Sequence, residues 1–210
     1  DLPEFGKYNV DPREWDVVGR ISWVHNFLKD IREIAPDMQI DFIEGNHEYR
    51  MLRHLAEQSP AMQAVLADLH GWTIPKLLGL EKYEVNYIAP ADLATLSKSE
   101  MNKAMGRNFK VYNDMFIACH FPSAKSMGLP GVSGHHHGRE MWQSYNPIVG
   151  RYEWHQIGCG HKLEATYTNG EKWGLGFGIV SLDTERKHCN TDSILITDHA
   201  WIGGKLYVRP

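Results

Sequence analysis

The sequence predicts an α/β fold in which two β-sheets pack face to face and helices lie outside them. Three observations support this class. An amphipathic helical pattern over residues 17–35 precedes a short apolar strand at residues 38–43, polar side chains follow that strand directly, and short strands alternate with turns in the C-terminal third. A helix followed by a buried strand is typical of a βαβ unit, and successive short strands indicate an antiparallel meander. Two stacked sheets with outer helices accommodate both patterns.

Length and composition fit a single globular domain over residues 1–210. Its 210 residues are enough to bury a substantial core. With 42% hydrophobic and 23% charged residues, its composition is that of an ordinary globular protein. Its net charge of −4 gives no overall basic surface, and a local patch is hidden in such an average. Cys119, Cys159 and Cys189 are few and widely spaced, which indicates a reducing compartment. With neither a long apolar run nor a signal-peptide pattern, we expect a cytoplasmic protein with no membrane partner.

The first half of the chain predicts helices around two strands. Apolar residues recur every three or four positions over residues 17–35, where Pro36 ends the helix, and we expect Trp23 and Phe27 to be core aromatics. Further helices are predicted from His47 to about residue 58 and after Pro60. A strand is predicted at residues 83–88. Residues 90–107 contain a polar helix or an inserted lid at 92–105.

The second half predicts mainly strands. Residues 109–111 and 115–119 flank a Tyr-Asn-Asp turn, which is a hairpin signal. Neighbouring strand residues face opposite ways, so Cys119 and His120 cannot both reach one site, and we assign His120 to the site and Cys119 to the core. A looped, polar stretch follows. The meander is expected at residues 176–182, 194–197 and 202–207.

The sequence Gly45-Asn46-His47-Glu48 places donor atoms directly after the first predicted strand. Open α/β sheets bind ligands at this end of their strands. The structural alternative is that Asn46 caps a helix starting at His47, with Glu48 favourable in the first turn. Arg50 and Arg53 lie one and two turns further on, where they either meet an anion or are simply solvated.

Histidines are unusually frequent, at 12 of 210 residues, and three of them form Gly134-His135-His136-His137-Gly138. In an extended segment His135 and His137 point to one side and His136 to the other, which predicts a metal-binding pair. Cys159-Gly160-His161 resembles half of a structural zinc site, but no matching pair follows it. The other histidines have no predicted role: His25, His54, His70, His155, His188 and His199.

Taken together, Gly45-Asn46-His47-Glu48, a strand ending in His120, and Gly134-His135-His136-His137 resemble the last three motifs of the calcineurin-like metallophosphoesterases. Three motifs in the right order are more specific than any one of them. The resemblance covers residues 40–140 and implies an α/β/β/α sandwich. The family's Asp-x-His and Gly-Asp-x-x-Asp motifs are missing, and Asp1 resembles the last Asp of the second, so we expect a family member that lacks its first strands.

The resemblance implies a dinuclear phosphoesterase in which Asn46, His120 and His135 hold one divalent metal and His137 belongs to a second. His47 would be the proton donor to the leaving oxygen, oriented by Asp1, and Arg50 would bind substrate. Imidazole and amide ligands suit Mn, Zn, Fe or Ni. The expected reaction is metal-dependent hydrolysis of phosphodiesters or phosphomonoesters, of nucleotide or nucleic-acid type. With one imidazole at the second metal, we expect little activity from these 210 residues.

Two other functions remain open from the sequence. In one, the chain is a noncatalytic module in which His120, His135 and His137 hold one structural or regulatory metal ion. In the other, it is a binding protein without metal, and the histidines are packing and capping residues.

Overall fold

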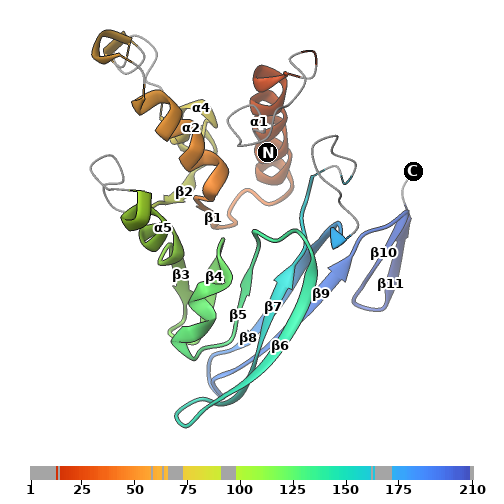
Figure 1. The fold of residues 1–210 in the computed structure, drawn as a ribbon. Coiled ribbons are helices and arrows are strands. Elements are labelled where there is room, and N and C mark those ends of the chain that lie inside the picture. The colour runs from red at the N-terminus through yellow and green to blue at the C-terminus, as the bar shows by residue number, and fades with distance from the viewer. Residues whose placement is uncertain are drawn as a thin grey trace. The chain divides into compact units, whose positions relative to one another are not determined.

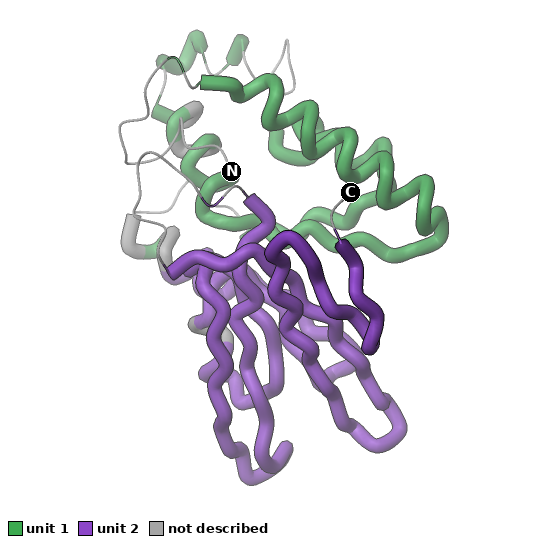
Figure 2. The backbone as a smooth tube through the Cα atoms, turned by 90° about the vertical axis from the view of Figure 1, so that its right-hand side faces the viewer, with its two compact units in different colours: residues 1–101 green, residues 102–210 purple. Residues whose placement is uncertain are grey.

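The computed structural model describes residues 13, 15–57, 59–62, 64–65, 73–90, 98–161, 163 and 172–208. The chain is a mixed α/β protein with several separate sheets. It divides into two compact units, residues 1–101 and 102–210, which are described one at a time (Figure 2). None of the described helices is both long enough and apolar enough to span a membrane.

Unit 1 is built around a parallel pair of strands, β1 and β2 (Figure 1). Its elements are α1 (Val17–Ile34), β1 (Ile40–Ile43), α2 (Asn46–Ala56), α4 (Ile74–Leu77), η3 (Glu81–Tyr83) and β2 (Val85–Ile88). The core contains side chains from α1, α2, α4 and the segment leading into β2: Leu28, Met51, Ile74, Leu78, Leu80, Tyr83 and Val85. The predicted order of helix, strand, helix and strand is therefore present.

The α1 helix buries only one narrow face. Leu28 is 5% exposed, and Ile21 and Val24 pack against the same cluster. Trp23 and Phe27 stack on each other with ring centroids 5.2 Å apart, but they are 59% and 49% exposed. The prediction that these two aromatics are core residues is wrong, because they lie on a different face of the helix from the buried stripe.

Unit 2 contains a five-stranded mixed sheet in the order β3-β4-β5-β7-β6. The last turns of α5 (Lys98–Gly106) lead into β3 (Phe109–Tyr112), β4 (Phe116–Cys119), η5 (Pro122–Met127), β5 (Gly131–Ser133), β6 (Arg139–Asn146) and β7 (Gly150–Ile157). Strands β4, β5 and β7 are parallel to one another, whereas β3 and β6 are antiparallel to their neighbours. Ile117, Cys119 and Trp154 form the buried cluster of this sheet, which confirms the predicted burial of Cys119.

A hairpin of β8 (Gly176–Asp183) and β9 (His188–Leu195) lies against β7 (Figure 1). Gly178 permits this approach, because a Cβ atom there would lie 3.1 Å from Ile157 Cγ2. The chain ends in a second hairpin, β10 (His199–Ile202) and β11 (Lys205–Val208). The single strand predicted at residues 202–207 is wrong, since Gly203 and Gly204 form a turn with positive φ angles of 55° and 78°.

The stretch predicted to be looped contains the longest strand pair of the sheet. Strands β6 and β7 pair antiparallel over eight residues each. Along β6 only Trp142 and Asn146 are even partly buried, which leaves little apolar pattern. On β7, burial alternates over residues 150–153 and then becomes continuous at Trp154, His155 and Gln156.

Candidate functional site

The carboxyl ends of three neighbouring parallel strands carry histidines in unit 2. His120 follows β4, His135 and His137 follow β5, and His161 follows β7 after a Gly-Cys-Gly turn. The strands end level with one another, because Ser133 of β5 pairs with both Cys119 of β4 and Gln156 of β7. Strand ends of this kind are where α/β sheets place ligands. The four imidazoles therefore come from one edge of one sheet.

The first pair of imidazoles is His120 and His135. His135 Nδ1 lies 3.1 Å from His120 Nε2, and the ring planes are inclined by 74°. The Phe121 ring packs beside both histidines, with its centroid 4.8 Å from that of His120 and 4.2 Å from that of His135. An apolar ring on this side lowers the local polarity around the two nitrogens.

The second pair of imidazoles is His137 and His161. His161 Nε2 lies 3.2 Å from His137 Nδ1. Trp173 packs edge-on against both rings, with centroids 4.6 Å from His137 and 5.1 Å from His161. The backbone N–H of Gly174 donates to the carbonyl of His137 at 2.9 Å, which anchors the chain carrying Trp173 beside this pair.

The segment that carries His135 and His137 is not extended. His135 and His137 have positive φ angles of 70° and 61°, and the N–H of His136 donates to the carbonyl of Gly134 at 2.9 Å. The expectation of an extended segment is therefore wrong. Positive φ is costly for residues with a side chain, so it is retained only where the surroundings impose it. The curled backbone lets His135 and His137 contact different partners, and leaves His136 exposed.

Two buried hydrogen bonds from β7 hold the ends of this loop. Trp154 Nε1 donates to Ser133 Oγ at 3.0 Å, and both residues are 1% exposed. Gln156, which is 2% exposed, donates from Nε2 to the carbonyl of Gly138 at 3.0 Å. These contacts fix the residues on either side of His135 and His137.

Each of the two imidazole contacts has the geometry of a side-chain hydrogen bond between two rings, and the same spacing also suits metal coordination. Two nitrogens bound to one divalent cation at about 2.0–2.1 Å lie roughly 2.9–3.4 Å apart in tetrahedral or octahedral geometry. The observed separations of 3.1 and 3.2 Å fall in this range. Across the described residues, however, no group of three or more His, Cys, Asp or Glu side chains is arranged to hold a metal ion. Each imidazole pair is therefore at most part of a coordination shell.

In unit 1, the Gly45-Asn46-His47-Glu48 segment follows β1 and begins α2. Asn46 is the first helical residue, which puts Gly45 at the N-cap position. Glu48 Oε2 accepts a hydrogen bond from the Gly45 N–H at 2.9 Å, which is the reciprocal half of a capping box. The structural alternative, in which Asn46 caps a helix starting at His47, is therefore wrong by one residue.

His47 is a neutral imidazole at physiological pH. Burial, reinforced by the positive charge of Arg50, lowers its pKa to about 4. Nearby, Tyr87 donates a hydrogen bond to Glu44, and burial raises the pKa of the Glu44 carboxyl despite that bond. Asn46, His47 and Arg50 belong to unit 1, and His120, His135 and His137 belong to unit 2. Asp1 lies outside the described residues.

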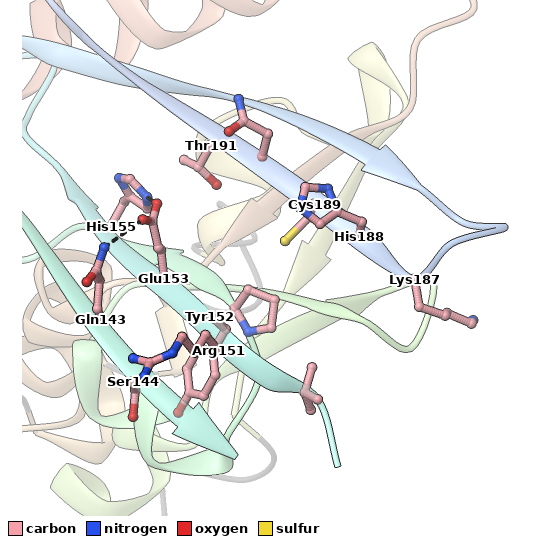
Figure 3. Close-up of a pocket in the computed structure, with 13 residues that line it drawn as sticks. Gln143, Ser144, Arg151, Tyr152, Glu153, His155, Lys187, His188, Cys189 and Thr191 are labelled. Carbon is pink, nitrogen blue, oxygen red and sulfur yellow. Dashed lines mark hydrogen bonds and ion pairs between the residues drawn. The ribbon is translucent and has the colours of Figure 1, made fainter. Parts of the chain in front are cut away.

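A different pocket of 340 Å³ lies between β7 and β9, with further lining residues from β6 (Figure 3). Gln143 donates to Glu153 at 3.2 Å, and Glu153 also pairs with His155 at 3.1 Å. Cys189 faces them from β9, and burial followed by the charge of Glu153 raises its thiol pKa. A thiol held protonated in this way is a poor nucleophile.

His161 is the residue that the sequence interpretation did not assign to a site with the other histidines. The signal would have been an imidazole directly after the end of a third parallel strand, but β7 was not predicted, so that position could not be recognised.

No family model, curated protein or solved structure matches this chain.

Proposed function

We propose that this chain is a metal-dependent phosphate-ester hydrolase with the two-sheet sandwich of the calcineurin-like phosphoesterases. The observation that carries the proposal is the pair of imidazole contacts at the carboxyl ends of β4, β5 and β7. Their nitrogen separations of 3.1 and 3.2 Å match those of two ligands on one cation. His120 and His135 would hold one cation, and His137 the other.

The chemistry of the donors supports a borderline transition metal. Neutral imidazoles bind Mn, Zn, Fe or Ni better than Ca or Mg. His161 adds a second nitrogen beside His137, so two imidazoles of this chain would hold the second cation. By the family resemblance, Asn46 would add an amide oxygen to the first cation. Two cations bound this way would stabilise the attacking and leaving oxygens of an in-line displacement.

The remaining roles come from the resemblance. His47 would protonate the leaving oxygen, with Asp1 orienting it, and Arg50 would bind the substrate phosphate. Because the pKa of His47 is about 4 in the free protein, the ring must gain its proton next to bound anionic substrate, which favours the charged imidazolium. The positive charge of Arg50 lowers the pKa of His47 in the free protein, and a phosphate bound by Arg50 would offset that charge.

The test measures metal content and hydrolysis on the same protein. The chain is reconstituted with Mn²⁺ or Zn²⁺, its bound metal is counted by elemental analysis, and turnover of bis(p-nitrophenyl) phosphate is followed. We expect bound metal and slow turnover, with His120→Ala/His135→Ala losing both. His188→Ala/His199→Ala is the matched control and should retain both.

The outcomes distinguish the alternatives. His47→Ala should keep the metal and lose turnover. One tightly bound ion without hydrolysis would instead favour the noncatalytic module that holds a structural or regulatory ion. Failure of the wild-type chain to bind either metal would overturn the proposal.

A further inference from the structure

An open pocket of 510 Å³ lies beside the first imidazole pair, within unit 2. One side is formed by His135 and His136, and another by the end of α5 and the residue after it. The lining residues are Lys103, Gly106, Arg107, Phe121, Pro122, Ser126, His135 and His136. A pocket of this volume accommodates a ligand of nucleotide size.

The pocket is positively charged, although the chain as a whole carries −4. Lys103 lies in the last turn of α5 and Arg107 directly follows the helix, and both side chains are exposed and line this pocket. None of the described residues that line the pocket is acidic. Two exposed basic side chains at a pocket whose described lining has no carboxylate are suited to an anionic ligand.

Aromatic rings line the same pocket as Lys103 and Arg107. The ring centroid of Phe121 lies 4.2 Å from that of His135. The ring centroid of His136, which is exposed, lies 4.8 Å from that of His135. Sites for single-stranded nucleic acid combine these two features, because cations follow the phosphate backbone while bases stack on aromatic faces. A small phosphomonoester needs neither a second basic side chain nor the aromatic rings.

We propose that this pocket binds a nucleotide of a single-stranded nucleic acid, with Lys103 and Arg107 on the backbone phosphates and His136 and Phe121 against a base. The pocket adjoins His135, so the bound nucleotide lies next to the phosphate that the metal centre would hydrolyse. That last step rests on the proposed function, whereas binding of the strand does not.

The experiment measures binding of a fluorescein-labelled oligothymidylate to the intact chain by anisotropy, in EDTA and at several salt concentrations. EDTA removes metal, so hydrolysis and metal coordination play no part. Lys103→Ala/Arg107→Ala should weaken binding at least tenfold and flatten the slope of log K against log salt by about 1.4, the value for two lost phosphate contacts. The charge-matched control Lys187→Ala/Lys205→Ala, outside this pocket, should leave the slope nearly unchanged.

Base stacking is tested separately. His136→Ala should weaken oligothymidylate binding roughly tenfold, in line with the loss of one stacked base. The same variant should bind an abasic strand of equal length as wild type does. Thermal unfolding checks that each variant remains folded.

Equal slopes for the two double variants, or no binding by wild type, would overturn this inference. Strand binding without hydrolysis by the metal-loaded protein would overturn the proposed function alone. If the Lys103 and Arg107 charges only stabilise the end of α5, the double alanine variant would be less stable but would bind the strand as wild type does. That result would also count against the proposal.

Discussion

His137 Nδ1 and His161 Nε2 lie 3.2 Å apart, although 24 positions separate the two residues in the chain. Both rings pack against Trp173. The contact links the loop after β5 to the turn after β7, and it would give the second proposed cation a nitrogen from outside the three family-like motifs.

The first prediction concerns this pair. His161→Ala should lower affinity for the second metal equivalent by about 10- to 100-fold, the usual cost of losing a ligand or its orienting partner. The affinity for the first equivalent should be unaffected, because His120 and His135 form a separate contact. Isothermal titration with Zn²⁺ measures both steps, and His199→Ala on β10 is the control. If His161→Ala changes neither step, the pair is only a packing contact.

The second prediction concerns Gly131 on β5. A Cβ atom at this position would lie 2.5 Å from the Trp154 ring and 2.6 Å from the Ile117 carbonyl oxygen. Since that carbonyl is backbone, the contact cannot relax easily. Gly131→Ala should therefore lower the free energy of unfolding by about 1–3 kcal/mol, measured in urea.

Gly160→Ala is the matched control for this substitution. A Cβ atom there meets no described atom within 4 Å, and its change should be within about 0.5 kcal/mol. Equal effects at the two positions would mean that β5 is not packed as tightly as the structure has it.

The third prediction concerns pH and His47. Its pKa of about 4 in the folded protein lies below the usual 6.5. Below pH 6.5 the unfolded chain takes up a proton at this ring and the folded chain does not. The contribution of the neutral His47 ring to the free energy of unfolding is therefore fully present above pH 6.5. It is lost as the pH falls toward 4, by on the order of 3 kcal/mol.

Urea unfolding of the chain at a series of pH values measures this loss. His47→Gln should flatten the curve between pH 6.5 and 4. His54→Gln, an exposed position on the same helix, should not. A wild-type curve with no slope in this window would contradict the burial of the neutral ring.

The fourth prediction concerns Cys119, at the end of β4. Burial raises the pKa of its thiol to about 12, and its Sγ donates to the carbonyl of Phe121 at 2.9 Å. Alkylation proceeds through the thiolate, so at pH 8 the folded protein should react at Cys119 roughly 1,000-fold more slowly than a thiol of ordinary pKa. Mass spectrometry after iodoacetamide treatment, with a urea-unfolded sample as control, measures the ratio. Rapid labelling of Cys119 under native conditions would show that β4 opens readily.

Local patterns in the sequence predicted the elements with strong periodicity. The helix expected over residues 17–35 is α1 at Val17–Ile34, and the hairpin around Tyr-Asn-Asp is present as β3 and β4. Asn113 and Asp114 both adopt positive φ, as a tight hairpin turn requires. In these places the local preference and the final packing agree.

The parts that were missed depend on contacts between distant segments. Strand β7 carries a polar and apolar alternation from Arg151 to His155 that could have identified it, and only the buried polar pair His155 and Gln156 depends on its neighbours in the sheet. The curled backbone at His135 and His137 is imposed from outside the loop, by Trp154 and Gln156 among others. A Gly-Gly turn at residues 203–204 was visible in the sequence, and it should have divided the last predicted strand into two.

The placement of β7 between β5 and β6 also determines when the two imidazole pairs can form during synthesis. A nascent chain that has emerged as far as His135 contains both members of the first imidazole pair, on strands β4 and β5 joined by a short connection. The second pair must wait until the ribosome has released β7 and its following turn. The first pair depends on the same release, because Trp154 and Gln156 of β7 hold the loop that carries His135. Since a domain generally folds as a unit, both pairs would form only after β7 has emerged.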